Sequence, residues 1–134
     1  MSAPIRILGL DPGSRATGWG VIESAGSRLS FVAAGVIRPR ARAARARRLG
    51  EIFAALGEVI GEHRPVEAAV EEIFVNASPR DALVLGEARG IALLAPAING
   101  VQVAEYAANR IKKSVVGRGH AEKGQVQTMI RALL

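Results

Sequence analysis

The chain has 134 residues, enough to bury one hydrophobic core of ordinary size. Hydrophobic residues make up 49% of it, which excludes a disordered chain, and the lack of cysteine excludes a disulfide scaffold and any thiolate metal site. No apolar run reaches the roughly 18 residues of a membrane span, so we expect a soluble, cytoplasmic protein with no membrane partner. The net charge of +6 favours a polyanionic partner, although an arginine-rich solvated surface would give the same charge.

The first third of the chain predicts three strands joined by short turns. An apolar run at 5–10 ends at an Asp-Pro-Gly turn. Residues 17–23 and 28–37 predict two further strands, separated by a Ser-Ala-Gly-Ser turn at 24–27. Consecutive strands with short turns between them favour an antiparallel meander.

The spacing of apolar residues changes near residue 44, where helices and strands begin to alternate. Apolar residues then recur every three or four positions up to Pro65. Ser78 and Pro79 form an N-terminal helix signal, and we expect Pro96 to bend or fray the last turn of that helix. The expected elements are a helix over 44–64, strands at 66–73 and 101–107, a helix over 79–99, and two helices beyond Asn109. This order predicts an α/β fold with a mixed sheet, three antiparallel strands followed by parallel strands, flanked by helices.

Asp11 ends the first apolar strand and precedes a glycine-rich turn. A carboxylate in this position lies at the edge of a sheet, and the small residues beside it let a phosphate and a hydrated cation approach. The alternative is an aspartate that only begins a Pro-Gly turn. The chain has one other aspartate, Asp81, in a helix-capping position.

Two adjacent glutamates, Glu71 and Glu72, lie near the end of the strand predicted at 66–73. Neighbouring strand residues point to opposite faces, so one glutamate can enter a site while the other faces solvent. Strand alternation does not choose between them, because apolar residues occur on both faces, and a polar strand end is an equal alternative. Phe74 follows in a predicted loop, either as a core residue or as an exposed platform for a stacked base.

Basic residues gather in two further places. Lys112, Arg118 and Lys123 stand near a predicted helix start, where a phosphate is favoured, although solvated helix ends are an equal alternative. The densest run of positive charge either follows a DNA backbone or forms a solvated helix face. It consists of Arg38, Arg40, Arg42, Arg45, Arg47 and Arg48.

The order of these segments resembles the RuvC family of junction resolvases, within the RNase H-like superfamily. The matching stretches are ILGLDPGSRATGWGVI at 7–22, VEEIFVN at 70–76, ALVLGEARGIALL at 82–94, and residues 103–134. The resemblance implies an RNase H-like fold and a bacterial, cytoplasmic crossover junction endodeoxyribonuclease. Such an enzyme makes paired symmetric nicks in four-way DNA junctions during recombination and repair.

The resemblance also implies a site and its partners. The site would hold two Mg²⁺ ions, with Mn²⁺ able to substitute, and the protein would act as a homodimer with a branch-migration helicase complex of the RuvAB type. The implied residues are Asp11 and Glu71 as catalytic metal ligands, Lys112 and Lys123 beside the scissile phosphate, and Phe74 against a base at the crossover.

The family's remaining acidic residues lie on a further C-terminal helix, and the sequence stops at Leu134 before it. We therefore expect residues 1–134 to form a single RNase H-like nuclease domain that lacks the final catalytic helix. An alternative for this polypeptide is a structure-selective DNA-binding module without cleavage activity. A phosphotransferase of the actin and sugar-kinase type is disfavoured, because those proteins duplicate the domain and need a chain more than twice as long.

Overall fold

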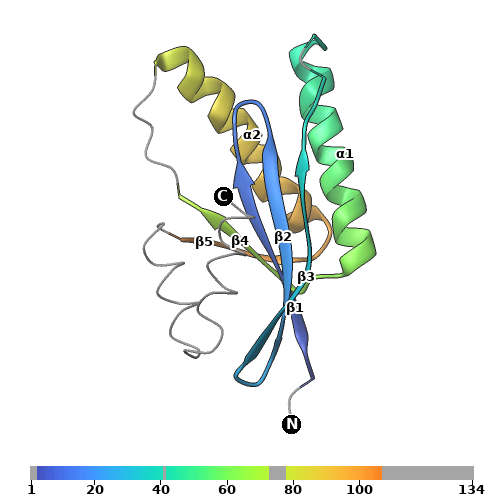
Figure 1. The fold of residues 1–134 in the computed structure, drawn as a ribbon. Coiled ribbons are helices and arrows are strands. Elements are labelled where there is room, and N and C mark those ends of the chain that lie inside the picture. The colour runs from blue at the N-terminus through green and yellow to red at the C-terminus, as the bar shows by residue number, and fades with distance from the viewer. Residues whose placement is uncertain (1–2, 41, 73–77, 107–134) are drawn as a thin grey trace.

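The computed structural model describes residues 3–40, 42–72 and 78–106. Five strands form one sheet in the order β3-β2-β1-β4-β5, and two long helices accompany it (Figure 1). The elements in chain order are β1 (Ile5–Pro12), β2 (Thr17–Ala25), β3 (Arg28–Ile37), α1 (Arg45–His63), β4 (Glu67–Glu71), α2 (Pro79–Ile98) and β5 (Gln102–Tyr106). The helices predicted beyond Asn109 lie outside the described residues. No helix within the described ranges is long and apolar enough to cross a membrane.

The sheet is mixed, as the sequence predicts. Strands β1, β2 and β3 pair antiparallel, whereas β4 pairs parallel with β1 on one side and with β5 on the other. Parallel neighbours need a long crossover, and the helices α1 and α2 provide it before β4 and β5 respectively. The first strand therefore takes the central position of the sheet.

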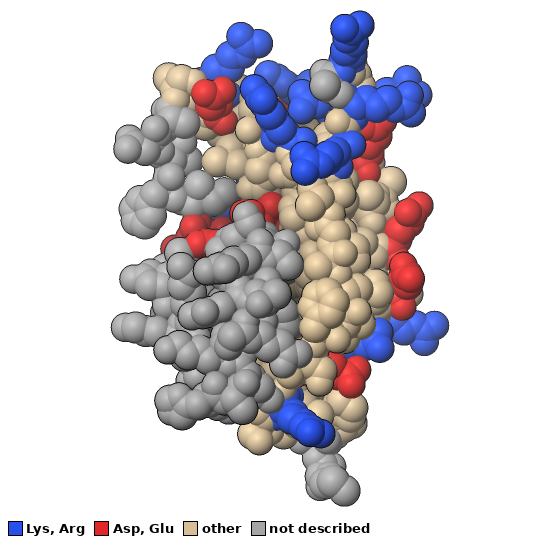
Figure 2. Space-filling view, in the orientation of Figure 1, with Lys and Arg blue, Asp and Glu red and all other residues tan. Residues whose placement is uncertain are grey.

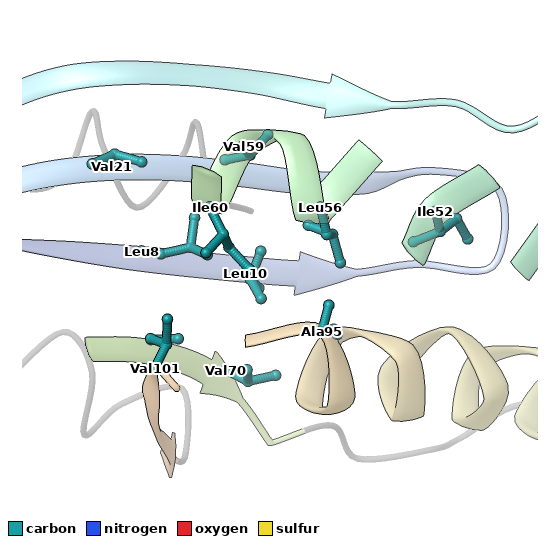
Figure 3. Close-up of a cluster of buried hydrophobic side chains, with 12 residues drawn as sticks. Leu8, Leu10, Val21, Ile52, Leu56, Val59, Ile60, Val70, Ala95 and Val101 are labelled. Atoms are coloured by element: carbon teal, nitrogen blue, oxygen red, sulfur yellow. The ribbon is translucent and has the colours of Figure 1, made fainter. Parts of the chain in front are cut away.

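The hydrophobic core lies between the sheet and the two helices. Leu8 and Leu10 of β1 point to the same face and are buried there with Leu56 and Ile60 of α1 (Figure 3). Strand β4 adds its own buried residues to this cluster, and α2 adds alanines, whose small side chains let the helix lie close to the sheet. Burying one leucine completely stabilises the fold by about 1.5–3 kcal/mol, so this layer fixes which face of β1 turns inward.

The second helix contains a proline in its last turn. Helix α2 runs through the buried Pro96 to Ile98, one residue before the predicted end at 99, and a bend at Pro96 stays a prediction. Asn99 caps this end, because its side-chain Nδ2 donates to the Ala95 carbonyl at 2.7 Å. At the other end, Ser78 caps the helix as predicted, and its Oγ accepts from the Asp81 backbone N–H at 3.2 Å.

Trp19 and Gly35 form a cross-strand pair in which the ring occupies the space above the glycine. The two residues are opposite each other in the β2–β3 ladder, and the ring of Trp19 also lies 5.6 Å from that of His63. A Cβ built at Gly35 would come within 2.8 Å of the indole ring. The glycine is therefore required by packing.

Gly35→Ala is expected to destabilise the protein by about 1–3 kcal/mol, because the tryptophan must leave its packed position. Gly50→Ala is the matched control, since its Cβ meets nothing within 4 Å and alanine favours the helix. Urea unfolding followed by circular dichroism measures both. Equal stability of the two variants would contradict the packing account.

Candidate metal centre

Asp11 and Glu71 lie side by side at the ends of two neighbouring strands. In the parallel ladder of β1 and β4, Leu10 pairs with Val70, and the next residue of each strand is the carboxylate. Leu10 and Val70 are buried in the core. Because strand side chains alternate, both carboxylates point to the opposite face, away from the two helices.

The structure thus chooses between the two glutamates. Glu71 is the last residue of β4 and is partly buried, whereas Glu72 lies beyond the strand and is exposed. Strand alternation alone could not decide this, because the predicted strand began at the exposed Val66 and ran to residue 73. The register with β1 decides it, since only Glu71 shares the face of Asp11.

The two carboxylates interact electrostatically. Burial, and to a lesser extent the negative charge of Glu71, together raise the pKa of Asp11 from its usual 3.8 to about 6. Within the described ranges neither carboxylate forms an ion pair with a lysine or arginine. A pair of partly buried carboxylates without a cationic side chain is a suitable place for a hard cation with oxygen ligands, such as Mg²⁺.

Arg89 of α2 contacts the C-terminal end of β4 from the face of the sheet that the helices cover. Its Nη2 lies 2.7 Å from Oε1 of Glu105 and donates a long hydrogen bond, 3.5 Å, to the Glu71 carbonyl oxygen. Glu105 pairs with Val70 in the ladder of β4 and β5, so it shares the helix-facing side. It therefore faces away from Asp11. Sequence reasoning missed this contact, because nothing in the local pattern links Arg89 to Glu105.

The turn after Asp11 is tight, and its backbone atoms lie close to one another. A Cβ at Gly13 would lie 2.6 Å from the Ala16 carbonyl oxygen, so only glycine fits there. This requirement for glycine comes from the turn itself, and the approach of a phosphate and a hydrated cation to Asp11 stays a prediction.

The structure brings together two of the residues assigned to the site from sequence, Asp11 and Glu71. Among the described residues no group of three or more His, Asp and Glu side chains could hold a metal ion. The other assigned residues lie outside the described ranges, and their roles stay predictions. These are Phe74, Lys112, Arg118 and Lys123.

The chain is similar to proteins of one family along almost its whole length. A family model described as "Crossover junction endodeoxyribonuclease RuvC" matches residues 7–134. The protein of that name from Methylocella silvestris is 58% identical over 132 residues, which cover 98% of this chain and 75% of that protein. The one from Hyphomonas neptunium is 58% identical over 134 residues, covering 100% of this chain and 80% of that protein.

Solved structures give the same result. The structure described as "T. thermophilus RuvC in complex with Holliday junction substrate" matches with a TM-score of 0.77 and 31% sequence identity, covering 97% of this chain and 79% of that chain. Thermus thermophilus RuvC in a second structure matches with a TM-score of 0.74 and 32% identity, covering 97% and 80% of the two chains. The mixed sheet and its helices thus have the same arrangement as in these two RuvC structures.

Asp11→Asn is expected to stabilise the metal-free protein at pH 8 by about 1–2 kcal/mol, after allowance for partial solvent screening. The folded state holds the Asp11 proton more tightly than the unfolded chain does, because its pKa is raised to about 6. Stability therefore falls as pH rises from about 4 through 6, and the variant escapes this loss. Thermal melts in EDTA at pH 5 and pH 8 measure it, with Asp81→Asn as control. A gain that does not shrink at pH 5 would contradict the assignment.

Proposed function

The chain belongs to the RuvC family of crossover junction endodeoxyribonucleases, and we propose that Asp11 and Glu71 are the metal ligands with which it cuts four-way DNA junctions. It is an endonuclease that binds junction DNA, in keeping with the relatives named above. The observation that supports the site most directly is the pairing of Leu10 with Val70, which places the two carboxylates next to each other on one face. A non-catalytic DNA-binding module is the less favoured alternative.

Divalent-metal dependence follows from family membership, and we propose Mg²⁺ as the ion, with Mn²⁺ as a substitute. Asp11 and Glu71 supply anionic oxygens, the donor type that Mg²⁺ prefers. Two ions held by these carboxylates would supply an activated water and would offset negative charge on the leaving oxygen. Two carboxylates do not fill two octahedral shells, so the remaining ligands come from water, from the substrate phosphate, or from residues outside the described ranges.

Four further residues have proposed roles at the DNA. Lys112 and Lys123 would neutralise charge that develops on the scissile phosphate, and Arg118 would contact the backbone. Phe74 would stack on a base at the crossover, an interaction worth about 1–3 kcal/mol per base. Phe74 follows β4 by three residues, so the strand that positions Glu71 also leads directly to it.

Two features support a homodimer: the twofold symmetry of a four-way junction, and an exposed face of α2 that could pack against a second copy. A twofold dimer presents two equivalent sites to two equivalent phosphates of a four-way junction. On α2, Leu83 and Leu94 are 57% and 46% exposed, and Gly86 and Gly90 lie between them on the same face. A Cβ at either glycine would meet nothing within 4 Å, so the glycines are not needed for packing inside the described part of the subunit. We propose that this stripe, Leu83–Gly86–Gly90–Leu94, contacts the same stripe of a second copy.

Two proposals rest on the family alone. These are a branch-migration helicase complex of the RuvAB type as partner, and the bacterial cytoplasm as location.

Asp11→Asn is expected to abolish metal-dependent cleavage of a four-way junction while changing junction affinity less than about threefold, because phosphate contacts and shape dominate affinity. Cleavage is followed on denaturing gels in Mg²⁺, and binding by mobility shift in EDTA. Asp81→Asn is the matched control, since this exposed carboxylate belongs to a helix start. Cleavage by Asp11→Asn at the wild-type rate would refute the metal assignment.

Leu94→Glu is expected to raise the dimer dissociation constant at least about tenfold, because it buries two unpaired charges across the stripe. Sedimentation velocity over a concentration series measures the shift. Val66→Glu is the control, since Val66 is similarly exposed, at 51%, but lies outside α2. A dimer that withstands Leu94→Glu would exclude the stripe as the interface.

A further inference from the structure

A pocket rich in arginine lies at the end of the sheet where Asp11 is found. Its volume is ≈ 190 Å³, and it opens between the turn after β1 and the N-terminal ends of α1 and α2. The polar residues that line it, which we call the arginine pocket, are Ser14, Arg45, Arg48, Arg80 and Glu87. Lys and Arg side chains gather at this upper end of the molecule (Figure 2). The pocket collects arginines from two segments that are more than 30 residues apart in sequence.

The charge of the pocket is positive after its internal ion pair is taken into account. Nε of Arg45 lies 3.6 Å from Oε1 of Glu87, so this pair is close to neutral. Arg48 and Arg80 form no ion pair with any described carboxylate. Two guanidinium groups therefore face a small, partly enclosed space without an anion.

Arg48 has a buried donor that the described residues do not satisfy. Its Nε is buried and has no hydrogen-bond partner, while its Nη2 donates only a long bond, 3.5 Å, to the Ser14 carbonyl oxygen. An unsatisfied buried donor costs about 1–3 kcal/mol, more when it is charged. The planar guanidinium matches the oxygens of a phosphate two at a time, so Arg48, which lines the pocket, is suited to bind a phosphate there.

The start of α1 adds to this preference for an anion. The residue that precedes it, Ala44, offers no side-chain cap, and the first turn contains no acidic residue. Helix α2, in contrast, has both a Ser78 cap and Asp81 in its first turn. The positive end of the 19-residue helix α1 thus has no acidic residue in its own first turn, and the one acid that lines the pocket, Glu87, is paired with Arg45.

We propose that the arginine pocket binds a phosphate group of the DNA backbone, one near the phosphate that is cut at Asp11. The choice of DNA rests on the proposed function; the preference for a phosphate rests on the pocket. Ser14 is three positions after Asp11, so their Cα atoms lie within about 11 Å of each other. Phosphates recur about every 3.4 Å of helix axis along one strand, so a strand held at Asp11 presents further phosphates within that range. The carboxylates and the pocket lie on opposite faces of the same sheet end, and the strand would pass over the β1–β2 turn between them.

The first test is the salt dependence of junction binding by the whole chain in EDTA. The double variant Arg45→Gln/Arg80→Gln is expected to weaken binding about tenfold at moderate salt and to reduce the slope of log K against log [NaCl] by about one. Both side chains are exposed, so the fold tolerates the change. The matched control is Arg47→Gln, on the same helix but outside the pocket, with less than a threefold effect expected. Glu87→Gln removes the acid of the pocket and is expected to tighten binding.

The second test uses inorganic phosphate in place of DNA. Phosphate is expected to raise the melting temperature of the wild type above that in chloride of equal ionic strength, and to lose this effect in Arg48→Gln and in the double variant. Should Arg48→Gln fail to fold, the double variant carries the comparison.

Pocket variants that match Arg47→Gln in both tests would overturn the proposal. Loss of phosphate protection with an unchanged DNA salt slope would assign the pocket to a free anion and overturn the DNA assignment. A wild type that binds phosphate but no junction DNA would refute the proposed function and leave the pocket.

Discussion

The parallel pairing of β1 with β4 is the constraint on which the rest of the structure depends. It makes the first strand the centre of the sheet, with its leucines buried under both helices. Because β3 and β4 run in the same direction as β1, both helices begin at the end of the sheet where β1 finishes. One end of the fold therefore holds Asp11, Glu71 and the starts of α1 and α2. A shift of one residue in this register would turn Glu71 into the core and separate the two carboxylates.

That end of the sheet holds charges of both signs which do not neutralise each other. The carboxylates point away from the helices, and burial with mutual repulsion raises the pKa of Asp11 to about 6. The arginines lie on the helix side, and one buried guanidinium nitrogen, Nε of Arg48, has no hydrogen-bond partner in the part of the chain that the structure describes. Each group would be stabilised by a component of a metal-bound nucleic acid strand: cations for the carboxylates and phosphates for the arginines. Without these ligands, the carboxylate pair and the arginine pocket each lower the stability of the folded protein, as is common where function needs unpaired polar groups.

Much of the fold could be predicted from the sequence, because its local signals agree with each other. Turn residues separate the first three strands, and the Ser78–Pro79 signal marks the start of α2 where the structure has it. Strand alternation could not choose Glu71 over Glu72, because the choice depends on which face of β4 meets a strand 60 residues earlier in the chain; only the family resemblance implied Glu71. The arginine pocket was likewise hidden, since Arg80 joins Arg45 and Arg48 only through the packing of α1 against α2.

Helix α2 contributes residues to the core, to the arginine pocket and to the proposed dimer contact. Its inner face carries the alanines that pack on the sheet, its first turn carries Arg80, and its outer face carries the leucine and glycine stripe. A helix of 20 residues is about 30 Å long and behaves as one body. The contact proposed between its outer stripe and a second copy would therefore set where both arginine pockets and both carboxylate pairs lie. The spacing of two cuts on a junction would then follow from the crossing of two α2 helices. The glycines between Leu83 and Leu94 allow that crossing to be close, because no side chain separates the two backbones there.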